Sequence, residues 1–234
     1  MLKNNLRLLI EFIVIISGVL LSFYIDDFRQ LQNKKLEKDI LIGELVITAR
    51  EDLKQIQNLK KDLIKVQDNI KIFLKDIQDN RKDIADKEIA KNYLFISEKM
   101  SVSFFPQDGI FTQLISTGSL ELIESNALKN LLLRNFTHYL DRNQANNRTL
   151  DDLYLDFVNN VDPFITVMSK DKQDASFIYT DRIVDSFSID SDYYLSNNFK
   201  AYLSSANTMV GKNIDMLNLF EKSYNQILEL ANKA

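Results

Sequence analysis

The sequence contains no cysteine among its 234 residues. This absence excludes disulfide bonds, thiolate catalysis and metal centres with cysteine ligands. The sequence also has a single histidine, His138, which is followed by Tyr139. A general base needs an orienting partner and a group to activate. We therefore predict that the protein is not an enzyme and has no catalytic residue.

Glycine and proline are scarce, with five and two copies. So few breakers favour long helices over a β fold that is rich in turns. They are also too few and too scattered for a phosphate-binding loop or a dinucleotide fingerprint. Asp185, Asp190 and Asp192 lack the spacing and the central glycine of a calcium loop. We predict no cofactor and no metal site.

Positive charge is not in excess either, because the formal net charge is −4. Nucleic-acid binders usually carry a basic face, so we predict no nucleic-acid partner. Hydrophobic residues make up 45% of the chain and charged residues 26%, which is enough to bury a core and keep a soluble surface.

The sequence does have a long apolar run, from Leu8 to Ile25, interrupted by Glu11, Ser17 and Ser22. Eighteen helical residues extend about 27 Å, close to the thickness of the bilayer hydrocarbon. No small-x-small cleavage site follows the run. We predict that residues 1–28 form a short tail and an uncleaved single-pass membrane anchor, and that the lipid bilayer is one partner.

Glu11, Gly18 and Ser22 form the candidate site. Their spacing places them within about 40° of one another on a helix. Gly18 and Ser22 are a small-xxx-small pair, which lets two helices approach closely in lipid. A carboxylate at bilayer depth costs about 2.5–3.5 kcal/mol and normally faces protein or water. We predict a helix-contact face for a homo-oligomer or a membrane-protein partner. Two alternatives stay open: snorkelling of Glu11 with Arg7, and an ion path in an assembly.

The flanks of the run disagree about orientation. Counting basic residues alone favours a cytoplasmic C-terminal side, whereas the net charge close to the run favours a cytoplasmic N-terminus. A domain of this size can be translocated largely regardless of its flanks. We predict an inner-membrane protein whose soluble domain is extracytoplasmic (periplasmic).

Residues 29–234 are predicted to form a soluble helical domain with two long helices, 36–80 and 197–233. Each helix repeats apolar residues at alternating spacings of three and four. On each helix these residues form one apolar stripe, the seam of that helix. Asp52 and Asn213 are polar residues that interrupt the two seams. They could fix the register of an antiparallel pair, or they could be solvated or locally paired polar residues, and both readings stay open.

The region between the long helices is predicted to be helical over 86–169 and a polar loop over 170–196. Ser125 or Asn126 has the character of an N-cap for a helix that reaches about Val161, after which Pro163 kinks or ends it. The predicted fold is all-α: a single N-terminal transmembrane helix that continues into an elongated antiparallel helical bundle, or coiled-coil-like domain.

Two stretches, "EFIVIISGVLLSFYIDDF" at residues 11–28 and "LISTGSLELIESNALKNLL" at residues 114–132, resemble an uncharacterised bacterial family of single-pass membrane proteins. "EFIVIISGVLLSFYIDDF" is similar to its N-terminal signature, in which a Glu, six apolar residues and a Gly precede an apolar run; Glu11 and Gly18 match. "LISTGSLELIESNALKNLL" is similar to its second, STGxLxLI signature. The resemblance implies a membrane-anchored helical protein of unknown activity and supplies no catalytic residues.

Two functions remain in view from these features. The first is a membrane-anchored helical scaffold or accessory protein that assembles through the transmembrane face and the long helices. The alternative is a sensory or ligand-binding ectodomain that signals through a partner subunit, because the seven residues before the run cannot hold an output domain.

Overall fold

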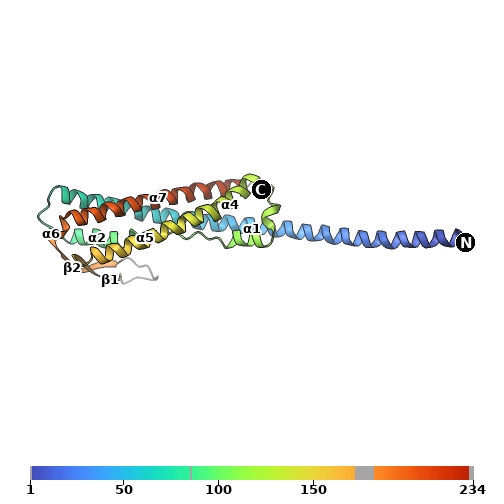
Figure 1. Ribbon diagram of the computed structural model, residues 1–234, viewed down its shortest axis with the longest axis horizontal. Helices are drawn as coiled ribbons and strands as arrows, with labels where there is room; N and C mark the ends of the chain where they lie inside the picture. The colour runs from blue at the N-terminus through green and yellow to red at the C-terminus, as the bar shows by residue number, and fades with distance from the viewer. Residues whose placement is uncertain (1, 85, 172–181, 232–234) are drawn as a thin grey trace.

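A single helix, α1 (Leu2–Gln78), runs through both the predicted anchor and the first predicted long helix. The structure is a computed structural model that describes residues 2–84, 86–171 and 182–231, with side chains from residue 10 onward. The N-terminal part of α1 projects alone, and the C-terminal part of α1 lies inside an elongated bundle (Figure 1). The largely helical architecture with long helices is confirmed.

The second long helix, α7 (Asn197–Ala231), packs antiparallel against α1. Lys60 forms an ion pair with Glu221 at 2.6 Å, and farther along α1 the side-chain amide of Gln67 donates to the Asn207 carbonyl at 3.5 Å. The apolar seam positions of both helices are buried, including Ile56, Leu63, Ile70, Val210 and Leu217. The C-terminus consequently lies at the end of the bundle from which α1 projects (Figure 1).

Shorter helices fill the space beside this pair. They are α2 (Lys87–Lys99), α3 (Gly109–Ser116), the 3₁₀ turn η1 (Ser119–Leu122), α4 (Asn126–Leu133), the π-helical turn η2 (Arg134–Tyr139) and α5 (Leu140–Asn160). The last three follow one another without a break, and the Ser125 hydroxyl accepts from the amide of Leu128 at 3.2 Å. The helix ends at Asn160, before Pro163.

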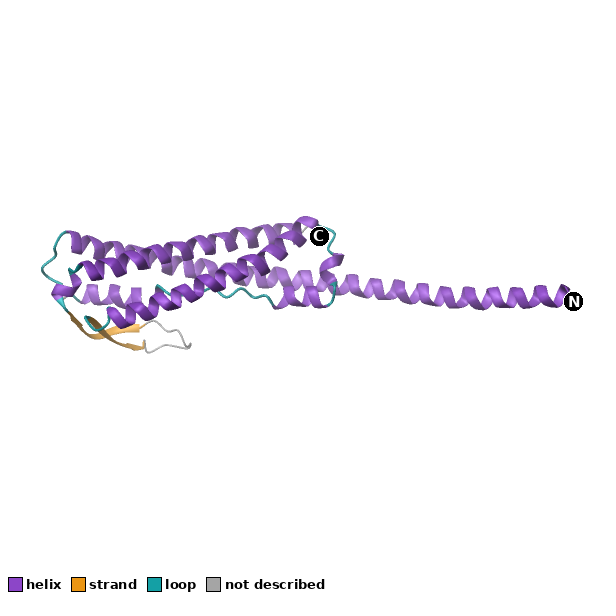
Figure 2. Cartoon of the chain, viewed as in Figure 1, coloured by secondary structure: helices purple, strands orange, loops and turns teal. Residues whose placement is uncertain are grey.

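A β-hairpin corrects the prediction of an all-α fold. Strands β1 (Ile165–Asp171) and β2 (Arg182–Ile189) pair antiparallel, with an irregularity between Met168 and Ser169 (Figure 2). The hairpin and the short helix α6 (Ser191–Tyr194) occupy much of the segment predicted as a polar loop. Polar and apolar residues alternate over parts of both strands, as from Ser186 to Ile189, and a half-exposed strand shows that pattern. Residues 172–181 of the predicted loop lie outside the described part.

Residues 102–108, between α2 and α3, form an extended segment that runs through the bundle. Asp52 and Asn213 are both buried and hold this segment. Asp52 accepts hydrogen bonds from the Tyr224 hydroxyl at 2.6 Å and from the Gln107 backbone amide at 3.1 Å. The Asn213 amide donates to the Val102 carbonyl at 3.0 Å. An extended segment has no internal backbone partners, so side chains must supply them. The two polar seam residues are therefore paired internally and not solvated.

Two further asparagines, Asn143 and Asn147 of α5, serve the same segment. Both side-chain amides donate to the Phe104 carbonyl, at 2.7 and 3.1 Å. The Phe104 ring is itself fully buried and contacts Phe220 edge-on at 5.1 Å between centroids. Asparagine amides thus fix this non-helical segment within a helical core.

The predicted transmembrane helix is not confirmed. Among the residues whose side chains the structure describes, no helix is both long enough and apolar enough to cross a membrane. Residues 1–9 of the predicted anchor, which include Leu8 and Leu9 of the apolar run, lie outside those described side chains.

Candidate functional site

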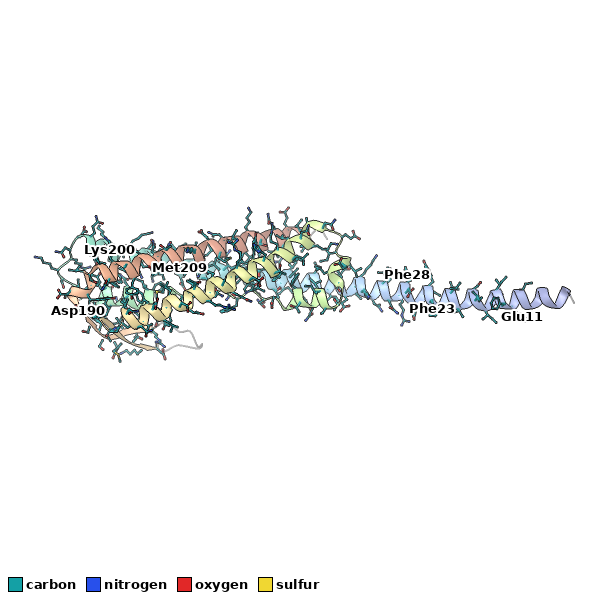
Figure 3. All side chains as sticks on the ribbon, viewed as in Figure 1. Glu11, Phe23, Phe28, Asp190, Lys200 and Met209 are labelled. Atoms are coloured by element: carbon teal, nitrogen blue, oxygen red, sulfur yellow. The ribbon has the colours of Figure 1, made fainter. Side chains whose placement is uncertain are left out.

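The projecting part of α1 carries the predicted contact residues. All residues from 10 to 37 are exposed, and the bundle begins to cover the helix only at Leu41 and Ile42. Figure 3 shows Glu11, Phe23 and Phe28 along this segment, well away from the bundle.

A continuous apolar band covers this segment from Ile10 to Ile25. Its large apolar side chains are between 40% (Ile16) and 69% (Tyr24) exposed, and Glu11 is its single charged residue. Soluble monomers rarely expose contiguous apolar surface of this extent, and such surface marks an interaction site. The band therefore has the character of a surface that another apolar surface covers.

Gly18 and Ser22 lie on one side of the band, one turn apart. The Ser22 hydroxyl donates to the Gly18 carbonyl at 2.9 Å, which uses the hydroxyl within the helix. A methyl group built at Gly18 would meet no heavy atom within 4 Å among the described residues. Glu11 is exposed two turns earlier on the same helix. The structure therefore leaves space along this side for a second helix.

Three tyrosine–aspartate pairs, which the sequence did not predict, join distant parts of the bundle. Tyr224 donates to Asp52, Tyr194 to Asp76 at 2.8 Å, and Tyr93 to Asp162. Each pair links residues that are at least 69 positions apart. A bulky aromatic side chain with a polar tip suits this role, because the ring fills the core and the hydroxyl reaches a carboxylate.

Burial controls the protonation of these pairs. Desolvation is the largest cause that raises the pKa of Tyr93, Tyr194 and Tyr224, and the neighbouring carboxylates raise it further. Desolvation also raises the pKa of Asp52 and Asp162, and the tyrosine hydrogen bonds partly offset this effect. At neutral pH the tyrosines remain protonated donors. Their hydroxyls therefore act as hydrogen-bond donors that link distant elements of the bundle.

The described residues contain no group of three or more His, Cys, Asp or Glu side chains that could hold a metal ion. The lone His138 lies 5.8 Å from the Tyr139 ring in a tilted arrangement.

Two hollows lie at the end of the bundle remote from the projecting segment. The first, about 780 Å³, is lined by Asn160, Asp190, Tyr202 and the stacked rings of Phe164 and Tyr193, whose centroids are 4.2 Å apart. The second, about 570 Å³, lies between α1, α2 and β2 and is rich in lysine. Lys87 and Lys91, one turn apart, were the single local signal for it. Lys99 ends the same helix, and the remaining cations, Lys65 of α1 and Arg182 of β2, come from elements far apart in the sequence.

Comparisons of the chain with protein-family models, curated proteins and solved structures each found no match. The resemblance to the single-pass family therefore stays a prediction that rests on the two quoted stretches.

Proposed function

We propose that the protein is a membrane-anchored helical scaffold or accessory protein. The apolar band on the projecting segment would lie in the bilayer, and the bundle would present its surface outside it. The single observation that carries this proposal is the continuous exposure of apolar side chains from Ile10 to Ile25. With Leu6 to Leu9 added, the segment extends about 30 Å, which matches the bilayer hydrocarbon.

The chain between the band and the bundle supports a defined spacing. From Ile25 to Leu41 the helix continues without interruption. These sixteen residues extend about 24 Å. A continuous helix transmits position better than a flexible linker does. We propose that it holds the bundle at a fixed distance from the membrane, on the extracytoplasmic side of the inner membrane.

Glu11, Gly18 and Ser22 would form the contact face between anchors. The open space at Gly18 supports close approach of a second helix. The carboxylate of Glu11 would then face that helix or water instead of lipid. We propose a homo-oligomer or a membrane-protein partner at this face, with the exposed sides of the long helices adding contacts.

Membrane fractionation of the full-length chain tests the anchor. We expect the wild type in the membrane pellet after high-salt and alkaline washes, and in the supernatant only with detergent. The double variant Ile16→Lys, Leu20→Lys places two charges in the band, at about 2.5–3.5 kcal/mol each. It should shift substantially to the soluble fraction.

The matched control is Leu155→Lys, Leu219→Lys, which changes leucines of the bundle surface that are 56% and 39% exposed. It should remain in the pellet. A wild type that stays in the supernatant without detergent, or an equal release of both double variants, would overturn the anchor.

A ligand-binding ectodomain is the second candidate function. The lysine-rich hollow between α1, α2 and β2 supports it.

A further inference from the structure

The lysine-rich hollow brings together three elements of the bundle. Lys65 and Asn69 come from α1, a row of side chains comes from α2, and Arg182 and Val184 come from β2. Figure 1 shows α2 and β2 at the end of the bundle that is farthest from the N-terminus. A volume of about 570 Å³ lies in the range of small-molecule sites.

The charge of this hollow opposes that of the whole chain. Five cationic side chains line it (Lys65, Lys87, Lys91, Lys99 and Arg182) against two carboxylates, Glu88 and Glu98. The chain as a whole has a formal net charge of −4. Clustering of one sign of charge in a hollow focuses the field and raises the local concentration of the opposite ion.

The carboxylates are already engaged, and several of the lysines are not. Glu88 pairs with Lys91 at 2.8 Å, and Glu98 lies 3.6 Å from Arg182. Among the described residues, Lys65 and Lys99 have no carboxylate within ion-pair distance, and Lys99 is half-buried. Positive charge therefore remains for a ligand.

Asn69 supplies an independent observation. Its side chain lines the hollow, is only 6% exposed, and its amide nitrogen has no hydrogen-bond partner in the described structure. A buried donor without an acceptor costs about 1–3 kcal/mol. The nitrogen itself is buried, so a small turn of the Asn69 side chain toward the hollow would offer it to a bound acceptor and remove that cost.

The wall behind these polar groups is apolar. Leu94 and Val184 are each 8% exposed and pack together. Phe95 is half-buried, and the Lys65 ammonium lies 4.2 Å from its ring centroid. The hollow thus offers cations and the Asn69 amide above an apolar surface.

We infer that this hollow binds a small soluble oxyanion, a phosphate or carboxylate group attached to a compact apolar body, with Lys99 and Asn69 at the anionic group. The apolar part would lie on Leu94, Phe95 and Val184. This deepens the proposed function, because the scaffold would carry a ligand site at its distal end.

Its position selects a soluble ligand over a lipid headgroup. Lys65 lies forty residues beyond Ile25 on the same helix. This corresponds to about 60 Å along the axis. Headgroups of the bilayer that holds the proposed anchor would not reach the hollow. This step rests on the proposed function.

Thermal unfolding of the detergent-solubilised full chain, at constant ionic strength set with sodium chloride, provides the test. The probes are phenyl phosphate, benzoate, inorganic phosphate, benzyl alcohol and short-chain dihexanoyl phosphatidylglycerol. A ligand that binds the folded state raises the unfolding temperature by mass action. We expect the largest shift from phenyl phosphate or benzoate, a smaller one from inorganic phosphate, and none from benzyl alcohol.

Two variants locate the binding. Asn69→Leu removes the unpartnered donor without breaking a recorded side-chain hydrogen bond, and Lys99→Gln removes one charge. Each should weaken binding of the aryl anion about tenfold or more, since hydrogen bonds to charged groups are among the stronger ones. Lys71→Gln is the control, because Lys71 is on α1 but does not line the hollow, and its side chain is 66% exposed. It should bind as the wild type does.

Absence of a shift with every anion, or equal weakening by all three variants, would overturn the site. Tighter binding of the phosphatidylglycerol than of phenyl phosphate would overturn the soluble ligand. Inorganic phosphate that binds as tightly as the aryl anions would overturn the apolar part. The assay needs no bilayer, so its failure leaves the anchor proposal untouched, and fractionation failure leaves the binding result untouched.

Discussion

The two parts of α1 share one helical backbone and differ in everything that surrounds it. From residue 10 to 37 every side chain is exposed, whereas from Leu41 to Phe73 the seam positions are almost fully buried. From Ile10 to Ile25 the first part has apolar residues on almost every side, whereas the second part has its buried apolar residues in a stripe. A helix that is apolar all round requires an apolar environment, whereas a striped helix buries one face in its own domain. Helix formation alone therefore says little about where a helix resides.

The largest contrast should come from removing one leucine in each part. Leu63→Ala leaves a cavity at a fully buried position and should lower the free energy of unfolding by about 2–5 kcal/mol. Leu20→Ala changes a side chain that is 62% exposed in the isolated chain. It should change the free energy of unfolding by less than about 0.5 kcal/mol. Urea denaturation in mild detergent measures both. Similar losses would mean that the projecting part packs against something within the chain.

The next largest effect on stability should come from the buried hydrogen bonds of Asp52. Asp52→Ala leaves the Tyr224 hydroxyl and the Gln107 amide without their acceptor and should cost about 1–3 kcal/mol. Asp68→Ala, on the same helix, removes only an exposed pair with Lys71 and should cost less than about 1 kcal/mol. Equal stabilities of the two variants in the same denaturation would contradict a structural role for Asp52.

The pH dependence of Asp52 sharpens this contrast. Burial raises its pKa above the ordinary 3.8, so the folded state holds the proton more tightly than the unfolded state. Stability from this group therefore increases as the pH falls through the raised pKa toward 3.8, and decreases as the pH rises. Relative to Asp52→Asn, the wild type should gain stability on going from neutral to mildly acidic pH. Denaturation of both proteins at several pH values measures the difference.

Asp162 also has a pKa raised by burial, but it is present in both proteins and cancels in the comparison. A difference that does not change with pH, or that changes in the opposite direction, would contradict the assignment to Asp52.

The smallest effect on stability, and the sharpest on assembly, should come from two glycines of α1. A Cβ at Gly18 or at Gly43 would meet nothing within 4 Å among the described residues, so Gly→Leu should raise helix stability at both by somewhat less than 1 kcal/mol. Only Gly18 lies on the proposed contact face. Gly18→Leu should reduce the oligomeric mass or the recovery of a partner from detergent extracts, and Gly43→Leu should not. Identical masses for wild type and both variants would contradict a contact at Gly18.

The pairing of α1 with α7 could be predicted because its signal is local. The apolar residues of each seam repeat every three or four positions, and a period of this kind needs no knowledge of the partner. The hairpin was missed because its alternation is short and most of its exposed positions are polar, as in a loop. The tyrosine–aspartate pairs were missed because each joins residues from different elements. The cationic hollow was missed for the same reason, since Lys65, Lys99 and Arg182 come from three elements.

The sequence by itself determined the long helices, their antiparallel bundle and the apolar band at residues 10–25, because periodicity and the scarcity of glycine and proline act within each segment. Only the tertiary structure decided that Asp52 and Asn213 hold an extended segment, that three tyrosines link the elements, and that scattered lysines meet around an unpartnered asparagine. These contacts depend on which faces meet when the chain folds, and residues far apart in sequence carry no local signal of that meeting.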